Sequence, residues 1–411
     1  MKPTVPMTDE AASLRRVREG SLCAGCGACA AVAPGKVTMA MTPPGYLRPI
    51  QTASLTPGED AAIAAVCPGL GITVGDAGRK SHDLWGPYLE TWTGWATDSD
   101  MRHAGSSGGA LSMIVLHLLE TGEIDAAVTN RASTEVPVAN QPVVVTDRAG
   151  ILDAAGSRYA PSAPLADIRA YVATGRRHAF VGKPCDVAAM RALAARDPAV
   201  AAAFPVMLSF FCAGIPSQSG AEEILSVLGT TLPDTQSFRF RGNGWPGMAT
   251  AIDRQGKSRA MSYNDSWGKI LTRHIQHRCK ICADGSGMSA DIVCADAWES
   301  DENGYPVFDE REGVSLIVAR TDLGKRIVDA AAAAGRIARE PFDIAGLAAM
   351  QPGQRFRRRV VAARMAALRL AGRPVPRYRG LRLVAAARDG SVKFFVQNFV
   401  GMFRRILAGR M

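Results

Sequence analysis

The sequence predicts an α/β protein in which a small cysteine-rich module precedes a mixed α/β core. Two observations carry this prediction. Three cysteines fall between residues 23 and 29, and between about residues 108 and 334 apolar stretches of strand length alternate with amphipathic stretches of helix length. Hydrophobic residues make up 47 % of the chain, which is enough to bury a large core and excludes global disorder.

The elements of the core are expected in a fixed order. Helices are predicted over 108–120, 164–174, 186–195, 218–228 and 322–334, and strands over 124–129, 178–181, 206–211, 290–296 and 314–319, with an antiparallel patch over 237–262. We expect an N-terminal module (1–80), two successive parts of the core (81–175 and 176–350) and a basic helical tail (351–411).

Composition and charge exclude several classes of protein. No apolar run reaches the ~18–20 residues of a membrane span, and no apolar segment typical of a secretory signal opens the chain, so we expect it in the cytoplasm. The net charge is +10, but residues 352–411 alone carry fifteen Lys or Arg and one acid, which leaves −4 on the rest. An acidic main body argues against a nucleic-acid partner.

The first cysteines have the spacing of an iron–sulfur site. Cys23, Cys26 and Cys29 are separated by pairs of small residues, which lets a tight loop point three thiolates at one bulky cluster. Bacterial ferredoxins continue this run with Cys-Pro; here Ala33 stands at that position, and Cys67-Pro68 supplies the pair further along. The sequence therefore predicts a ferredoxin-like module with one 4Fe–4S cluster on these four cysteines. A zinc site would need two more conventional C-x2-C pairs.

A second cysteine set is spread over the core. Cys279 and Cys282 form a C-x2-C pair, while Cys185 and Cys212 each follow an expected strand. Because strand ends of an α/β sheet converge on one edge, the four cysteines are candidate ligands of a second cluster. Ordinary buried cysteines are the competing interpretation, and Cys294, inside an expected strand, is interpreted as structural.

A glycine-rich turn stands directly before the helix expected at 108–120. Ser106, Ser107, Gly108 and Gly109 offer free N–H groups, short hydroxyls and little bulk, which suits a pyrophosphate at a helix N-terminus. Serine and glycine are also common at helix caps and turns. Beside an iron–sulfur cluster the turn favours FAD, because a flavin exchanges both single electrons and electron pairs. The core is therefore predicted to bind flavin.

Several motifs in order resemble one known family over residues 20–320. They are the C-x2-C-x2-C run, Arg102 with Ser106–Gly109, Gly156-Ser157-Arg158-Tyr159, Gly182–Asp186, Phe211–Gly214, Cys279–Cys282, Ala290–Ile292 and Asp296–Trp298. Together they resemble the β subunits of coenzyme F-420-reducing hydrogenases and F-420-dependent formate dehydrogenases, a family that also includes chlorophyll-modifying reductases.

The resemblance implies an iron–sulfur flavoprotein. It assigns FAD to Ser106, Ser107, Gly108, Gly109, Ser157, Arg158 and Tyr159, and clusters to Cys23, Cys26, Cys29, Cys67, Cys185, Cys212, Cys279 and Cys282. The chain departs from the family pattern at Ala33, at Ala295 and at Arg158, where lysine is usual. A basic extension like the one after residue 350 occurs in bacterial members that sit beside polysaccharide-synthesis enzymes. Use of coenzyme F-420 itself is not implied.

Further polar and aromatic residues have two interpretations each: tuning the site or stabilising the fold. They are His103, Lys183, Asp186, Trp245, His274 and His277. The tail is expected to form helices over 354–370 and 392–407. An apolar helix with basic flanks suits an anionic membrane surface, here the inner face of the cell membrane, and equally an acidic ferredoxin, while packing on the chain's own body is the commonest outcome.

We expect a cytoplasmic FAD- and iron–sulfur-dependent oxidoreductase that passes electrons between a carrier such as ferredoxin, one or two 4Fe–4S clusters, FAD and a small two-electron organic acceptor. One alternative is an electron-transfer β subunit of a larger complex, linked to polysaccharide synthesis and without substrate chemistry of its own. Another is a zinc-binding regulatory protein whose tail touches nucleic acid, which the acidic body and the cysteine spacing disfavour.

Overall fold

The core of the molecule is an eight-stranded mixed sheet. The computed structural model describes residues 9–299, 301–302 and 307–409. The strand order across the sheet is β16 (Ile337–Pro341), β6 (Glu90–Ala96), β15 (Ser315–Ala319), β14 (Ile292–Asp296), β10 (Val206–Phe210), β9 (His178–Gly182), β7 (Ala126–Ala132) and β8 (Asn140–Val145). The four strands from β14 to β7 are parallel to one another. Each strand outside them pairs antiparallel with its neighbours in the sheet.

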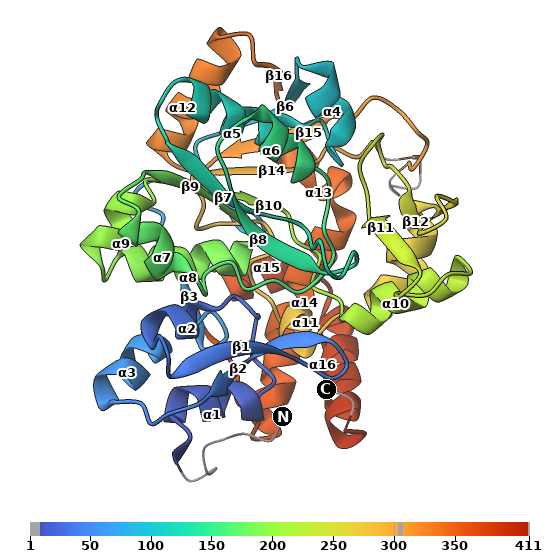
Figure 1. Ribbon diagram of the computed structural model, residues 1–411. Helices are drawn as coiled ribbons and strands as arrows, with labels where there is room; N and C mark the ends of the chain where they lie inside the picture. The colour runs from blue at the N-terminus through green and yellow to red at the C-terminus, as the bar shows by residue number, and fades with distance from the viewer. Residues whose placement is uncertain (1–8, 300, 303–306, 410–411) are drawn as a thin grey trace.

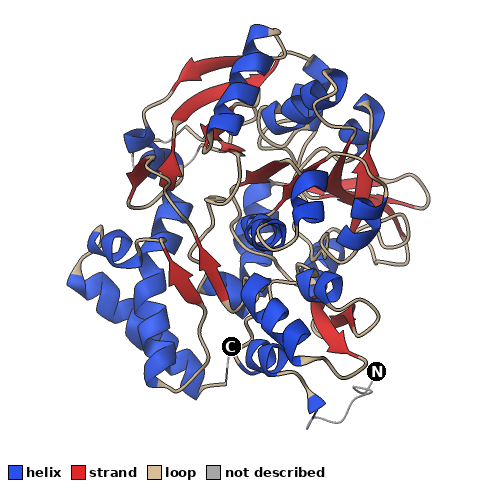
Figure 2. Cartoon of the chain, turned by 90° about the vertical axis from the view of Figure 1, so that its left-hand side faces the viewer, coloured by secondary structure: helices blue, strands red, loops and turns tan. Residues whose placement is uncertain are grey.

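Helices cover both faces of this sheet, which explains why its central strands are apolar throughout. Residues of α5 (Ala110–Glu120), α6 (Arg148–Asp153) and α12 (Asp322–Ala333) share one hydrophobic cluster with one face. Residues of α7 (Ile168–Ala173), α8 (Pro184–Ala194) and α9 (Pro198–Ala203) pack against the other. Figures 1 and 2 show these layers from two directions.

The N-terminal module packs at one end of the core (Figure 1). It holds α1 (Ala12–Glu19), α2 (Ala28–Val32), the hairpin of β1 (Val37–Thr42) and β2 (Tyr46–Gln51), and α3 (Pro57–Val66). A capping box between Thr56 and Glu59 starts α3. The connection to the sheet carries β3 (Gly71–Thr73), β4 (Lys80–His82) and β5 (Gly86–Tyr88), and α4 (Ser99–Ala104) follows β6.

A smaller antiparallel sheet lies beside the core. Its strands are β11 (Thr235–Arg239), β12 (Ala249–Asp253) and β13 (Ser258–Met261), packed with α10 (Gln218–Val227). A π-helical turn (Asn264–Ile270) and a 3₁₀ turn (Leu271–His274) lead to the short helix α11 (His277–Lys280), which carries the second cysteine pair.

The C-terminal part is built into the molecule. It comprises a 3₁₀ turn (Ile344–Gly346), α13 (Leu347–Met350), α14 (Pro352–Leu370), β17 (Arg377–Arg379), α15 (Leu383–Arg388) and α16 (Val392–Leu407). β17 pairs in parallel with β3, and one hydrophobic cluster joins Val17, Ile72, Ile281, Val361 and Met402. The basic C-terminal helices therefore share a core with the N-terminal module and with the second cysteine loop.

The structure confirms the predicted α/β fold class and the antiparallel patch. The predicted helix over 164–174 is shorter, because residues 165–167 form turns and α7 begins at Ile168. Strands β6, β8 and β16 were not predicted; all three are antiparallel strands at or near the sheet margins, with mixed composition and partial exposure. No described helix is long and apolar enough to cross a membrane.

Candidate functional site

Parallel pairing of β14, β10, β9 and β7 brings their carboxyl ends to one edge, where ligands bind in open α/β sheets. A cavity of about 280 Å³ opens there. It is lined by the start of α5, the 154–160 segment, residues that follow β9 and β10, and the end of β14. The predicted convergence of strand ends is therefore confirmed.

Most of the residues predicted to hold FAD line this cavity. Ser106, Ser107, Gly109, Ser157, Arg158 and Tyr159 all belong to its wall. The Oγ atoms of Ser106 and Ser157 lie 2.6 Å apart, which joins the two segments. The N-cap residue of α5 is Gly109, with φ +69° and no side-chain cap, and Ala110 and Leu111 of the first turn also line the cavity. An uncapped first turn of this kind fits an anionic group.

Two of the predicted residues have structural partners. Gly108 is outside the cavity wall and donates its N–H to Ser315 Oγ at 2.9 Å; a Cβ there would meet backbone atoms of Ser315 and Gly94 within 3.0 Å. The Arg158 guanidinium donates to Asn140 Oδ1 and to the carbonyls of Phe238, Pro137 and Ala139. Arg158 therefore ties β8 and the 137–139 turn to β11, and burial lowers its pKa to about 10.

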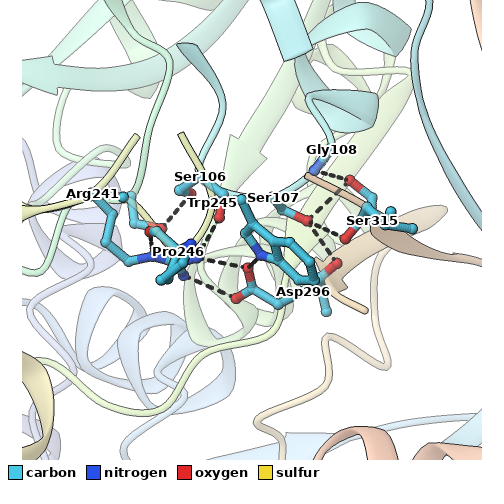
Figure 3. A network of polar contacts seen from close by, with 12 residues as sticks. Ser106, Ser107, Gly108, Arg241, Trp245, Pro246, Asp296 and Ser315 are labelled. Atoms are coloured by element: carbon cyan, nitrogen blue, oxygen red, sulfur yellow. Dashed lines mark hydrogen bonds and ion pairs between the residues drawn. The ribbon is translucent and has the colours of Figure 1, made fainter. Parts of the chain in front are cut away.

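A network of charged and aromatic side chains contributes to the cavity wall, and its polar contacts are drawn in Figure 3. Arg241 is wholly buried and binds both carboxylate oxygens of Asp296, at 2.9 and 3.0 Å, and the carbonyls of Ser106 and Pro246. The Trp245 indole donates to Asp296 and stacks on Trp298 at 4.9 Å. Arg241 and Trp298 line the cavity, whereas Trp245 is outside its wall and anchors the loop.

A second buried ion pair stands where β9 meets α8. Lys183 Nζ lies 2.6 and 2.8 Å from the carboxylate oxygens of Asp186, and the two side chains are 4 % and 1 % exposed. Burial lowers the pKa of Lys183, but the Asp186 carboxylate more than offsets this, so Lys183 stays cationic. Both residues line the cavity, and their charges also act on the thiols of Cys26 and Cys185. The pair thus lies between the cavity and members of both cysteine sets.

The first cysteine set lies in one place. Cys23, Cys26, Cys29 and Cys67 all line one small apolar cavity in the N-terminal module. The loop needs left-handed glycines to turn so tightly, with φ +78° at Gly25 and +86° at Gly27. Burial raises the pKa of the Cys67 thiol to about 11, Cys23 adds to this, and the N–H groups of Gly69 and Leu70 oppose it. Four thiols with backbone N–H donors around them fit a 4Fe–4S cluster.

The second set also gathers. Burial raises the pKa of the Cys212 thiol to about 12, and Cys279 and Cys282 contribute to the rise. Burial also raises the pKa of the Cys185 thiol, and Cys212 and Cys282 contribute to that rise. Cys212 also lines the main cavity. Cys294 lines it too, but its side chain packs in the hydrophobic core, and burial alone raises the pKa of its thiol.

Arg278 links the two sets. It is 2 % exposed, precedes Cys279 and donates from Nη2 to the carbonyl of Pro68 at 2.7 Å, next to Cys67. Its charge acts on Cys67 and on Cys185, Cys279 and Cys282. Its Nε is buried without a hydrogen-bond partner among the described residues. A buried cation with a spare donor fits an anionic group on either side of it.

Comparisons with known proteins decide the family. Models of the N-terminal and C-terminal parts of the coenzyme F420 hydrogenase/dehydrogenase beta subunit match residues 91–168 and 175–345. The chain belongs to this family. A chain of the F420-reducing (NiFe) hydrogenase complex from Methanosarcina barkeri has the same fold, with a TM-score of 0.54 and 21 % identity over 68 % of this chain and 91 % of that chain. No curated protein matches the sequence.

In this member of the beta subunit family, other predicted candidates lie away from the cavity. His103 is exposed, and His274 pairs with Glu223 at 2.8 Å. His277 is buried among Arg278, Lys280 and Arg364, and burial and these cations lower its pKa to about 4. Within the described residues, no group of three His, Cys, Asp or Glu side chains is placed around a single metal ion.

Sequence reasoning missed several residues of the cavity wall. Arg241, Tyr263 and Trp267 come from the smaller sheet and the π-helical turn, and Gln351 and Gln354 come from the C-terminal part. Their only available signal was composition, since a glycine-rich loop follows Arg241 and aromatic residues are frequent there. The family motif at Asp296–Trp298 did mark this end of the site.

Breaking the Lys183–Asp186 pair is expected to destabilise the fold, because each single change leaves one unpaired buried charge or dipole. K183M and D186L are each expected to lower the free energy of unfolding by about 3–5 kcal/mol, and the double variant K183M/D186L by less than the sum. Denaturant unfolding measures this. K269M is the control, because its exposed partner Asp265 leaves a loss within about 1 kcal/mol. Additive losses would contradict the coupling.

Proposed function

We propose that this chain is an FAD- and iron–sulfur-dependent oxidoreductase that passes electrons between a one-electron carrier such as ferredoxin and a small two-electron organic acceptor. One observation carries the proposal. Cys212 belongs both to the second cysteine set and to the cavity wall, so a cluster bound by that set would share a residue with the ligand cavity. Membership in a hydrogenase/dehydrogenase subunit family agrees with redox chemistry.

The main cavity supports FAD. The first turn of α5 would receive the pyrophosphate, because its N–H groups are uncapped and the neighbouring side chains are short. Ser106 and Ser157 would donate to the same part of the ligand, and Trp298 and Tyr263 offer apolar surface for rings. Arg241, held by Asp296, fixes the wall between these two regions.

The two cysteine sets support two 4Fe–4S clusters, one on Cys23, Cys26, Cys29 and Cys67 and the other on Cys185, Cys212, Cys279 and Cys282. Bound clusters would carry single electrons and bound FAD would exchange one or two, so reduction of the acceptor by hydride needs two electrons from two carrier molecules and one proton. The residues between the sites, Lys183, Asp186 and Arg278, are charged and buried, and hold fixed fields across the electron path.

The competing proposal is an electron-transfer beta subunit of a larger complex. It is favoured by the solved structure with the same fold, which is a chain of a multi-subunit hydrogenase complex. Turnover by the purified chain separates the two proposals. Reduction of an organic acceptor with an artificial one-electron donor alone supports the enzyme, whereas a chain that accepts electrons and reduces nothing further supports the subunit.

Anaerobic purification is expected to give about eight irons, eight sulfides and one FAD per chain. C26S and C67S should each lose about four irons, as should C185S and C282S, because each removes one of four thiolate ligands. C294S is the matched control and should keep all eight, since the Cys294 side chain packs in a hydrophobic cluster that contains none of the eight proposed ligand cysteines. Iron, acid-labile sulfide and the visible spectrum are measured. Zinc without iron or flavin would refute the proposal.

Flavin binding is expected to depend on the charge at the start of α5. S106D places a carboxylate beside the uncapped helix N-terminus, where it would compete with a phosphate for the same donors. We expect S106D to lose at least about tenfold in FAD affinity, by flavin fluorescence on release, while S106A changes it far less. Equal retention of FAD in S106D and wild type would place the phosphates elsewhere.

We also propose that the outer face of α16 rests on an anionic membrane surface. Val392, Val396, Val400 and Leu407 are 80, 51, 38 and 75 % exposed. Exposed Lys393 and Arg404 lie on the same helix, and the one acid in residues 352–409, Asp389, is paired with Arg355 and Arg359. Apolar side chains flanked by cations match the chemistry of an anionic lipid surface.

Co-sedimentation with vesicles tests this surface. Wild type is expected to bind vesicles that contain phosphatidylglycerol better than pure phosphatidylcholine vesicles, and less at high salt. V396D/V400D should abolish binding. V227D, which changes a similarly exposed valine on α10, should bind like wild type. Absence of binding by wild type, or equal loss in V227D, would contradict the proposal; capture of ferredoxin instead would assign the face to an acidic protein.

A further inference from the structure

Side chains of the C-terminal part of the chain donate hydrogen bonds to the loop that carries Cys279 and Cys282. The carbonyl of Cys279 accepts from Arg357 Nη2 at 2.9 Å, and that of Lys280 from Arg364 Nη1 at 2.7 Å. The carbonyl of Ile281 accepts from the Tyr378 hydroxyl at 2.9 Å, and that of Ala283 from Arg358. Four of the five carbonyls between residues 279 and 283 are therefore bound by one C-terminal segment, residues 357–378. We call these four side chains the C-terminal clamp.

The clamp is anchored as firmly as the loop it holds. Arg358 is 2 % exposed and also donates to the carbonyls of Leu84, Asp83 and Leu381. α14 and the loop share a hydrophobic cluster through Ile281, Val361 and Met365. Buried donors and apolar packing on both sides leave the loop little freedom, so the clamp arginines keep fixed positions relative to Cys279 and Cys282.

The clamp places an excess of positive charge at this loop. The charge of Arg357 acts on the Cys212 thiol, and the charge of Arg358 acts on the Cys282 thiol. The loop itself adds the cations Arg278 and Lys280. The cations repel one another: burial, together with the charges of Arg405 and Arg357, lowers the pKa of Arg364 to about 10. Buried cations at this density call for an anion between them, and a cluster bound by four thiolates carries negative charge that grows on reduction.

The first cysteine set has a different electrostatic environment. Arg278 acts on Cys67, whereas the anionic Asp186 acts on Cys26. The Lys183–Asp186 pair acts on both sets, through Cys26 and Cys185, and Arg278 also acts on both, so the clamp arginines beside the second set make the difference between them. Cations favour the reduced form of a nearby redox centre, because that form carries one more negative charge.

We propose that the C-terminal clamp raises the reduction potential of the second cluster above that of the first and thereby directs electrons from the N-terminal module toward the cavity. This inference rests on the proposed function and names Arg357 and Arg364 as positioning residues. The one-electron carrier is oxidised as it gives up each electron. That electron would reside preferentially on the cluster bound by the second cysteine set, which shares Cys212 with the cavity wall.

The test separates charge from hydrogen bonding on the full chain, purified anaerobically. R357Q and R364Q keep an N–H donor for the loop carbonyl and remove the charge, whereas R357K and R364K keep the charge. R369Q removes an exposed charge from the same helix and is the matched control. Redox titration followed by electron paramagnetic resonance gives the midpoint of each cluster, and iron analysis gives their number.

We expect one midpoint to fall in R357Q and in R364Q, so that the share of electrons on that cluster relative to the other drops on the order of tenfold, the effect of one charge near ~10 Å at an effective dielectric constant near 20. The lysine variants and R369Q should keep the wild-type midpoints. Eight irons with unchanged midpoints in both glutamine variants would overturn the clamp proposal alone. Fewer than eight irons in wild type would overturn the two-cluster function itself. If one glutamine variant loses iron, the other provides the same readout.

Discussion

The parallel pairing of β14, β10, β9 and β7 is the constraint from which the site follows. It places Asp296, Cys212 and Lys183 at the same edge although they are far apart in the sequence. Antiparallel β15 returns to that edge with Ser315, which holds Gly108 and Ser107 and so fixes the start of α5. The cavity, the helix start and one cysteine of the second set thus depend on one register of strands.

Buried charge is the second feature of this site, and it would link the stability of the fold to the insertion of the proposed clusters. The Lys183–Asp186 pair is almost removed from water, Arg241 is buried against an Asp296 side chain that is 20 % exposed, and burial raises the pKa values of the Cys67 and Cys212 thiols. A cluster binds thiolates, so its insertion must release protons and would neutralise the field of Arg278 and the clamp. The apoprotein would keep those cations without a counter-charge, which is costly in a buried loop. We therefore regard folding of this region and cofactor insertion as coupled.

Sequence reasoning reached the α/β class because the central strands are uniformly apolar and the helices between them are amphipathic. It proposed two cysteine sets from their local C-x2-C spacings, and the strand-end rule predicted that Cys185 and Cys212 follow neighbouring strands at one edge, as they do. It missed β6, β8 and β16, which are partly exposed and of mixed composition. The resemblance carried FAD binding onto Arg158; the structure places Arg158 in the cavity wall with four protein acceptors on its guanidinium, a long-range arrangement that no local pattern encodes.

The C-terminal basic region shows why composition alone does not place a charge. Fifteen basic residues against one acid left a membrane surface, an acidic partner and packing on the chain's own body open, and in the structure many of these arginines bind inside the molecule. Arg357, Arg358 and Arg364 hold the carbonyls of the second cysteine loop, and Arg373 binds the carbonyl of Glu19 in the N-terminal module. Backbone carbonyls are acceptors that no charge count includes, so a segment without acids still finds partners for its cations. On the outer face of α16 exposed cations stand beside exposed apolar side chains, so composition alone could not separate the arginines that bind inward from the cations that face outward.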